Sequence, residues 1–233
     1  MSSHGTTIHE VLRGTALLSA AATGTIESLA RSSHWRTLDK DEVLFIAGSR
    51  ATNVFAVATG TLRVFTSGPG GTEPTLALLT PGDLVGELGV LDGVPRSTSV
   101  GALRRSDVVE VPAAAFRAAY DGDPEIPRRL VTLLSERMRS LNDGFTDLAS
   151  LDLGGRLAKY LVGEVDRQRR STVRLTLTQA ELGQLLGGAR QSVNQVMQSL
   201  ERAGLVEAKG RTIAVLDLDG LRRRALTPSG RFS

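Results

Sequence analysis

The sequence predicts an α+β fold in which an antiparallel, β-rich half leads into a long helix and then a mainly helical half. Three observations predict it. Short β-rich runs separated by turn residues fill the chain from Trp35 to about Val111. An apolar helical repeat begins near Pro124 and continues to about Ser150. Beyond it, helix start and stop signals alternate at short intervals.

Length and composition limit the alternatives. The chain has 233 residues, 41% hydrophobic and 23% charged, as in a globular protein of about two domains. It contains no cysteine, which excludes disulfides, thiol nucleophiles and thiolate metal sites, and its three histidines lack metal-ligand spacing. No apolar run approaches the roughly 20 residues of a membrane helix, and no secretory signal is visible. We therefore expect no metal, no membrane contact and a cytoplasmic location.

The N-terminal half begins with helical spacing and then becomes β-rich. Residues 8–33 carry apolar side chains at the intervals of short helices. Many short strands separated by glycine- and proline-containing turns then predict an antiparallel β-roll or sandwich. The expected strands are Val43–Ile46, Val54–Ala58, Thr61–Phe65, Thr75–Leu79, Thr98–Ala102 and Val108–Val111.

A long helix follows, and one of its faces is apolar. Pro124 suits a first helical turn, and apolar residues then alternate at spacings of three and four, as in a coiled coil. We expect this seam to form a homodimer; the alternative is one amphipathic helix packed on its own domain. Leu130 and Leu133 lie outside the seam and suit packing on that domain. The seam residues are Val131, Leu134, Met138, Leu141, Phe145 and Leu148.

The C-terminal half reads as a winged helix-turn-helix. Thr178–Glu181 is a capping box that opens a short helix, and Gly187-Gly188 breaks it. A second helix is expected from Ala189 to Ala203, with Gly204 as its stop. A hairpin with a basic tip, Leu205–Val215, follows as the wing.

The surrounding segments complete this half. Asp152 indicates the N-cap of a preceding helix, Arg167–Ser171 reads as a basic loop, and Val173–Leu177 suits a strand. The expected domains are a sensor domain over residues 8–123, a dimerisation helix over 124–150 and the winged helix-turn-helix over 151–226.

Charge indicates the partner of the C-terminal part. Residues 153–233 hold 14 Lys/Arg and 7 Asp/Glu, a net +7, whereas residues 1–152 are net −4. Such asymmetry favours a polyanion over a chance solvated surface, and the outward face of the second helix carries side chains suited to base edges and phosphates. The predicted DNA-binding residues are Thr178, Gln179, Arg190, Gln191, Ser192, Asn194, Gln195, Lys209 and Arg211.

A second motif runs from Gly86 to Ser97, Gly-Glu-Leu-Gly-Val-Leu-Asp-Gly-Val-Pro-Arg-Ser. Its glycines let the backbone approach a ligand, and N–H groups at a short helical turn bind anions. Arg96 can pair with a phosphate, and Glu87 can accept from a hydroxyl. Taken alone, a surface Glu–Arg pair in a loop explains the same residues.

This stretch resembles the phosphate-binding cassette of cyclic-nucleotide-binding domains. With the downstream helix-turn-helix, the chain from about Leu12 to Val215 resembles the cyclic-AMP receptor protein/FNR family of bacterial transcription regulators. The resemblance implies a cyclic-nucleotide-binding-like β-roll, a homodimer on a palindromic operator, RNA polymerase as a further partner and no enzymatic activity. Cyclic AMP is the expected ligand, with cyclic GMP or no ligand as alternatives.

The resemblance also implies roles for single residues. Gly86 and Glu87 would serve the sugar, with Glu87 accepting from the ribose 2′-hydroxyl, while Arg96 would neutralise the cyclic phosphate with support from Ser97. The implied ligand-binding set is Gly86, Glu87, Leu88, Arg96, Ser97 and Asn142.

The chain departs from the family pattern at both sites. Where the family's cyclic-AMP sensors meet adenine with a threonine and its polar successor, this chain has Leu141 and Asn142, and leucine cannot hydrogen-bond a base. Arg190 matches a guanine-reading arginine, but Gln191 and Gln195 replace a glutamate and an arginine, and Ala189 replaces the usual capping serine. We expect a related operator with shifted sequence preference. The FNR-type cysteines are absent.

Two further readings remain open at this stage. A regulator of the same fold with a vestigial or different ligand site would bind DNA without cyclic nucleotide, and Leu141 favours it. A cyclic-nucleotide-gated interaction module would use its winged domain for protein contacts, and the +7 charge argues against it. No nucleophile–base set or paired carboxylates suggest an enzyme.

Overall fold

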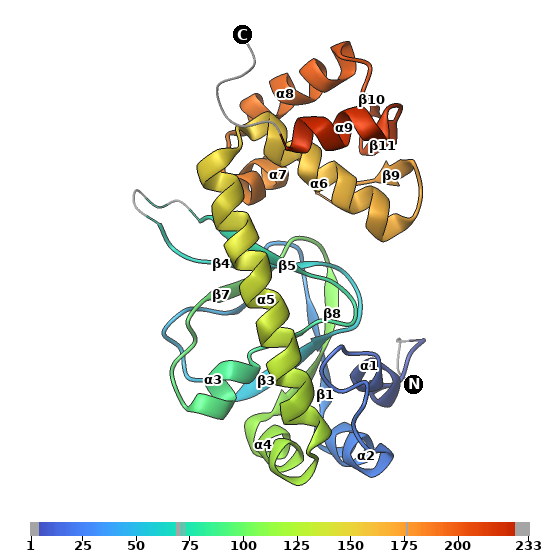
Figure 1. Ribbon diagram of the computed structural model, residues 1–233. Helices are drawn as coiled ribbons and strands as arrows, with labels where there is room; N and C mark the ends of the chain where they lie inside the picture. Colours follow the sequence, from blue (N-terminus) through green and yellow to red (C-terminus); the bar gives the residue numbers. More distant parts are fainter. Residues whose placement is uncertain (1–4, 69–70, 72, 176, 227–233) are drawn as a thin grey trace. The chain divides into compact units, whose positions relative to one another are not determined.

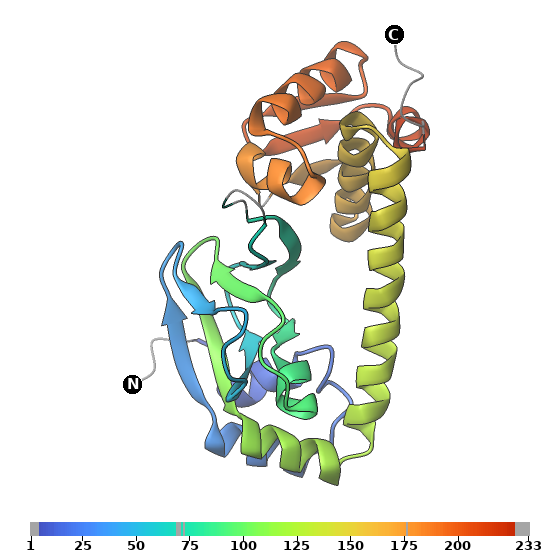
Figure 2. The same cartoon turned by 90° about the vertical axis from the view of Figure 1, so that its left-hand side faces the viewer.

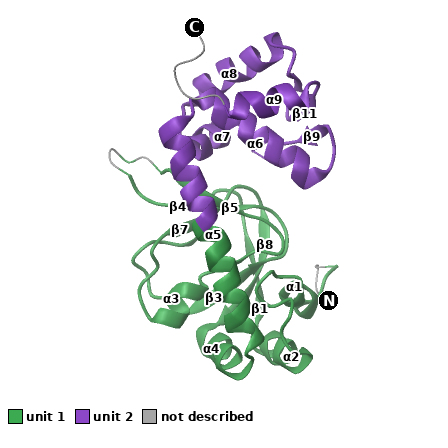
Figure 3. Cartoon of the chain, in the orientation of Figure 1, with its two compact units in different colours: residues 1–138 green, residues 139–233 purple. Residues whose placement is uncertain are grey.

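A computed structural model describes residues 5–68, 71, 73–175 and 177–226, and it confirms the α+β fold class. The chain divides into two compact units, residues 1–138 and 139–233 (Figure 3). Within the described ranges no helix is both long enough and apolar enough to cross a membrane.

Unit 1 contains two four-stranded antiparallel sheets. One has the order β1-β8-β3-β6 and the other β2-β7-β4-β5 (Figure 1). The predicted strands are confirmed to within two residues at each end, and β5 matches its prediction. The strands are β1 His34–Leu38, β2 Val43–Phe45, β3 Asn53–Val57, β4 Leu62–Phe65, β5 Thr75–Leu79, β6 Leu84–Val85, β7 Ser99–Ala102 and β8 Ser106–Pro112.

Strand β3 shows why the central strands are apolar throughout. Val54 and Ala56 face a core shared with helices, whereas Phe55 and Val57 face a second core within the roll. A strand covered on both faces has no polar side to alternate with. The first core is closed by α1 Ile8–Arg13, α2 Thr23–Ser32, α4 Ala113–Gly122 and the start of α5 Glu125–Ser150. Helix α2 lies beside α4 in both views (Figures 1 and 2).

Helix α5 carries its apolar residues on two faces. Leu130 is buried in the first core of unit 1, and Leu133 and Leu134 pack against it. Leu134, assigned to the dimer seam from the sequence, is therefore partly covered by its own domain. The other five seam residues, Val131, Met138, Leu141, Phe145 and Leu148, are exposed in the single chain.

Unit 2 is a helical bundle with a small sheet of order β10-β11-β9. The strand expected at Val173–Leu177 is shorter and ends at Arg174, and Thr176 lies outside the described residues. Helix α9 was not predicted. The elements are α6 Leu153–Gln168, β9 Thr172–Arg174, α7 Gln179–Leu186, α8 Arg190–Arg202, β10 Val206–Lys209, β11 Thr212–Val215 and α9 Leu218–Ala225.

Candidate ligand site and nucleic-acid interface

The glycine-rich motif of unit 1 forms a turn that leads into helix α3, Glu87–Asp92. Gly86 precedes the helix with φ +91°, a conformation that L side chains rarely adopt. A Cβ atom at this position would clash with Nη1 of Arg96. Glycine is therefore required here for backbone geometry and for the close approach of Arg96.

Arg96 is folded onto its own domain. Its Nη1 donates to the Gly86 carbonyl at 2.7 Å, and its Nη2 donates to the Asn53 carbonyl. Its guanidinium carbon lies 4.2 Å from the centre of the Phe45 ring, a cation–π contact. The residue is only 6% exposed, and its Nε has no hydrogen-bond partner among the described residues. Burial lowers the pKa of Arg96 from its usual value, and the Glu87 carboxylate opposes that shift.

Glu87 is also buried, at 2% exposure, and it is paired with a residue of α5. Nη1 of Arg137 donates to its carboxylate at 2.6 Å, and Nη2 of Arg137 donates to the Leu84 carbonyl at 3.2 Å. A buried carboxylate requires such a partner, because an unpaired charge in the interior is costly. The ion pair joins the cassette to the long helix.

Sequence analysis missed Arg137. One signal could have found it, since Arg137 follows Leu130 by seven residues, Leu133 by four and Leu134 by three. It therefore lies on the α5 face that packs on the domain, where a basic side chain needs an acidic partner.

The structure brings together three of the six predicted ligand residues: Gly86, Glu87 and Arg96. Leu88 and Ser97 belong to the same segment, but both are exposed. Asn142 belongs to unit 2, where its carbonyl accepts from the Thr146 hydroxyl. Its contact with a ligand stays a prediction.

In unit 2 the helix-turn-helix has the predicted local structure. The Thr178 hydroxyl accepts from the Glu181 N–H at 3.3 Å, and the Glu181 carboxylate accepts from the Thr178 N–H at 2.6 Å, which completes the capping box. Gly187 ends α7 with φ +68°. The second helix begins at Arg190, one residue later than predicted, and Ala189 is an N-cap without a side-chain hydrogen bond.

Helix α8 separates an apolar face from a polar one. Val193, Met197 and Leu200 are buried. Near its N-terminus the predicted contact residues face outward, with Ser192 half-buried. Gln179 of α7 donates through Nε2 to Oδ1 of Asn194 at 3.2 Å and so ties the two helices together. The exposed residues are Arg190, Gln191, Asn194 and Gln195.

The wing tip lies beside the helix-turn-helix. Thr178, Gln179, Arg190, Gly210 and Arg211 all border one hollow of about 430 Å³. The α7 start, the α8 start and the tip therefore form one continuous surface. Lys209 pairs with Glu207 at 2.8 Å, and this hydrogen bond raises the pKa of Lys209. Across the described residues no group of three or more histidines and carboxylates could hold a metal ion.

Comparison with known proteins gives a match for each unit. The model of the cyclic nucleotide-binding domain matches residues 35–123, and that of the Crp-like helix-turn-helix domain matches residues 155–224. The solved structure of a CRP-family transcriptional regulator from Thermus thermophilus is 26% identical, with a TM-score of 0.65, and covers 82% of this chain and 96% of that one. FixK2 from Bradyrhizobium japonicum, 22% identical with a TM-score of 0.73 and coverages of 82% and 96%, shares the fold.

Two curated relatives extend over most of the chain. The CRP-like cAMP-activated global transcriptional regulator of Mycobacterium tuberculosis is 27% identical over 221 residues, which are 93% of this chain and 99% of that protein. The cAMP-activated global transcriptional regulator Vfr of Pseudomonas aeruginosa is 30% identical over 198 residues, 82% of this chain and 92% of that protein. Because this likeness spans both matched domains, the chain belongs to the cyclic-AMP receptor protein/FNR family of nucleotide-modulated, DNA-binding transcription regulators.

Proposed function

We propose that the protein is a homodimer that binds a palindromic operator and that cyclic AMP, held by Gly86, Glu87 and Arg96, modulates this binding. The observation that carries the proposal is the ion pair between Glu87 and Arg137. It makes the sugar-binding carboxylate of the cassette a direct contact of the dimerisation helix. The names of the M. tuberculosis and P. aeruginosa relatives support cyclic AMP as the ligand.

The chemistry of the site supports an exchange of partners. A cyclic phosphate would offer anionic oxygens to a guanidinium that now donates to the neutral carbonyls of Gly86 and Asn53, and charge-assisted hydrogen bonds are the stronger kind. A ribose hydroxyl donating to Glu87 would share the carboxylate that Arg137 now holds. Ligand binding would thereby change the strength of the ion pair between Glu87 and Arg137 of α5. A ligand biases a conformational equilibrium through such a difference in interaction.

Replacement of Arg96 tests the ligand site. We expect Arg96→Gln to weaken cyclic-AMP affinity about 10- to 100-fold, the range for loss of a charged hydrogen-bond partner. Isothermal titration of the full-length protein with cyclic AMP and cyclic GMP measures the change. Arg105→Gln is the matched control, because Arg105 is an exposed arginine of the same unit that pairs with Asp39 on the surface. Circular dichroism confirms that both variants are folded.

Equal affinity in wild type and Arg96→Gln, or no heat from wild type with either nucleotide, would remove the ligand assignment. The second reading, a regulator that binds DNA without cyclic nucleotide, is favoured by Leu141, an exposed leucine that cannot hydrogen-bond a base. Operator affinity that is the same with and without cyclic AMP and cyclic GMP would support that reading.

We further propose that the protein acts in the cytoplasm, where its operator would lie, and that it contacts RNA polymerase rather than catalysing a reaction or using a metal. Membership in a family of transcription regulators supports these assignments. Transcription in vitro with purified polymerase, from a promoter that carries an operator selected from random duplex DNA by binding to this protein, tests the polymerase contact.

A further inference from the structure

The stretch from the last turn of α6 to the end of β9 carries four arginines that the proposed DNA interface does not use. Arg167 is occupied, because its guanidinium pairs with Glu164 at 2.6 Å, and that hydrogen bond raises the pKa of Arg167. Arg169, Arg170 and Arg174 are exposed. For these three guanidinium groups the described part of the chain offers no ion pair or hydrogen bond. Their charge is therefore available to an external anion.

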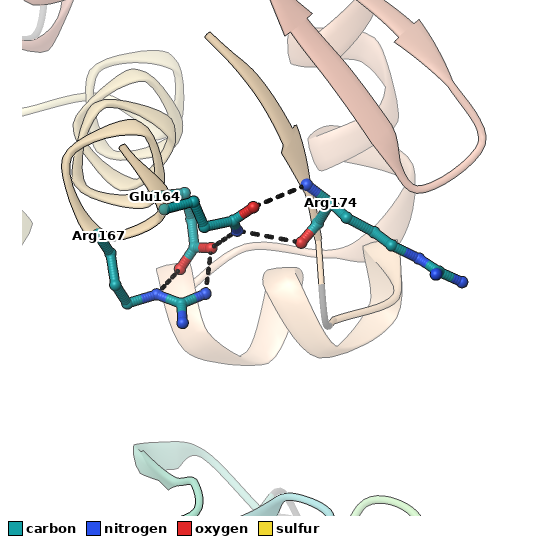
Figure 4. A network of polar contacts seen from close by, with 4 residues as sticks. Glu164, Arg167 and Arg174 are labelled. Carbon is teal, nitrogen blue, oxygen red and sulfur yellow. Dashed lines mark hydrogen bonds and ion pairs between the residues drawn. The ribbon is translucent and has the colours of Figure 1, made fainter. Parts of the chain in front are cut away.

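The backbone of Arg174 is fixed by the last residue of α6. Gln168 donates through Nε2 to Glu164 at 2.6 Å and to the Arg174 carbonyl at 3.2 Å, and its Oε1 accepts from the Arg174 N–H at 3.1 Å. Figure 4 shows this network, and it shows the Arg174 guanidinium pointing away from it. Arg174 is thus an outward cation on a held backbone, which loses little conformational freedom at the main chain when it binds.

Strand register places Arg174 in line with the wing. Arg174 pairs with Thr212, and Thr212 pairs with Lys209. Side chains of paired residues stand on the same face of a sheet, so these three form one exposed row. Lys209 lies about 10 Å from Arg174, two strand spacings away. Val173 and Ile213, in the next row, are buried on the opposite face.

Charge and polarity define what this row can bind. Glu207 neutralises Lys209, so Arg174 supplies the unpaired positive charge of the row. The row's third residue is Thr212, and Thr172 precedes Arg174 by two residues on the same face. A protein partner usually needs an apolar or aromatic anchor at the centre of its contact, and this row provides none. A polar, cationic row beside a nucleic-acid interface suits phosphate.

We propose that Arg174 binds a backbone phosphate of the duplex outside the bases that α8 faces, so that the DNA-binding surface extends from the wing tip across the sheet to β9. This inference rests on the proposed DNA contacts of Arg190 and Arg211. The contact carries no sequence information, because phosphates are the same at every base pair. It adds affinity and salt dependence on any duplex long enough to reach β9.

Salt titration of the full-length protein tests the contact. Fluorescence anisotropy measures the affinity for an operator selected from random duplexes, with and without about 10 flanking base pairs on each side. We expect Arg174→Gln to reduce the slope of log K against log salt by about 0.9 for each lost phosphate, so about 2 for a dimer. Its affinity should fall equally on operator and unrelated long duplexes, and it should match wild type on the short operator.

Two further variants separate the outcomes. Arg222→Gln removes the same unit charge from unit 2, but Arg222 of α9 pairs with Asp166 and Asp219, so it should leave the slope unchanged. Arg190→Gln should abolish the preference for the operator.

If Arg190→Gln abolishes that preference while Arg174→Gln keeps the wild-type slope, the β9 contact is refuted and the proposed function stands. If wild type binds no duplex, the proposed function itself fails. Normal DNA binding by Arg174→Gln with reduced transcription would assign the row to a protein instead.

Discussion

The carboxylate of Asp123 accepts hydrogen bonds at the starts of two helices. Its Oδ2 accepts from the Ala22 N–H at 2.8 Å, at the start of α2, and its Oδ1 accepts from the Glu125 N–H at 3.1 Å, at the start of α5. The first N–H groups of a helix have no partner inside the helix, so an outside acceptor stabilises it. The Ala22 hydrogen bond above all lowers the pKa of Asp123, against an opposing effect of burial.

Asp123→Ala should therefore destabilise unit 1 by about 1–2 kcal/mol at neutral pH, the usual cost of losing a helix cap. Because the folded-state pKa is depressed, this contribution is present above the unfolded-state pKa near ~3.9 and is lost as pH falls through the folded-state pKa. Urea unfolding at pH 7 and pH 3 measures the difference from wild type, which should shrink at pH 3. Asp121→Ala, an exposed neighbour, is the control. An equal difference at both pH values would contradict the role of the charge.

Single residues divide into those that sequence predicts and those that it does not. Thr178 and Asp152 were predicted as caps because their partners lie three residues away. The Ala22 partner of Asp123 lies 101 residues away, and the Glu87 partner of Arg137 lies 50 residues away. Contacts at that separation depend on the tertiary fold. Local spacing can place Arg137 on the packed face of α5, but it cannot identify Glu87 as the partner.

At the scale of elements, α9 is attached to the start of α6. The Asp152 carboxylate accepts from the Gly155 N–H at 2.7 Å and from Nη2 of Arg224 at 2.7 Å and 2.8 Å. Arg156, one turn into α6, donates to the carbonyls of Leu151 and Leu186 and so ties the same region to α7. Burial by itself raises the pKa of Asp152, and the Gly155 N–H and Arg224 bring it below its usual value.

Arg224→Gln should lower the free energy of unfolding of unit 2 by about 1–3 kcal/mol, because it leaves a partly buried carboxylate without its charged donor. A double-mutant cycle with Asp152→Ala isolates the pair. We expect the two substitutions together to cost less than the sum of the separate costs, by about 1 kcal/mol or more. Additive effects within error would mean that the α9 contact contributes nothing to the start of α6.

The elements that sequence analysis missed have weak apolar patterns. β1 buries only Leu38 of its five residues, and β6 has two residues. α4 buries Phe116 and Ala119 alone among many alanines, and α9 carries three successive arginines between its buried residues Leu221 and Ala225. Helices with local start signals, α6 and α7, were predicted closely. Elements that owe their existence to packing on a finished roll or bundle gave no comparable local signal.

For the whole molecule, helix α5 exposes a row of five large apolar side chains in the single chain. Phe145 is 76% exposed, and four other seam residues are each more than half exposed. A row of this kind along a helix favours a partner helix, because apolar area removed from water stabilises association. Membership in a family of dimeric regulators supports the homodimer.

Phe145→Glu should shift the protein from dimer to monomer, because each copy would bring a charge into the apolar seam. Analytical ultracentrifugation measures the shift, and operator affinity should fall with it, since a monomer engages one half-site. Thr132→Glu adds the same charge to α5 outside the seam and should leave the dimer intact. A Phe145→Glu protein that sediments as a dimer would assign this face to another role.

The amide of Gln168 has a consequence for how copies of this protein can associate. β9 is an edge strand, and the free N–H and C=O groups of an edge strand are a template on which another chain can add itself. The Gln168 side chain makes hydrogen bonds with both the N–H and the C=O of Arg174, as a residue of a neighbouring strand would. Copies that meet at high concentration therefore find no free backbone group at Arg174 on which to add a strand to β9.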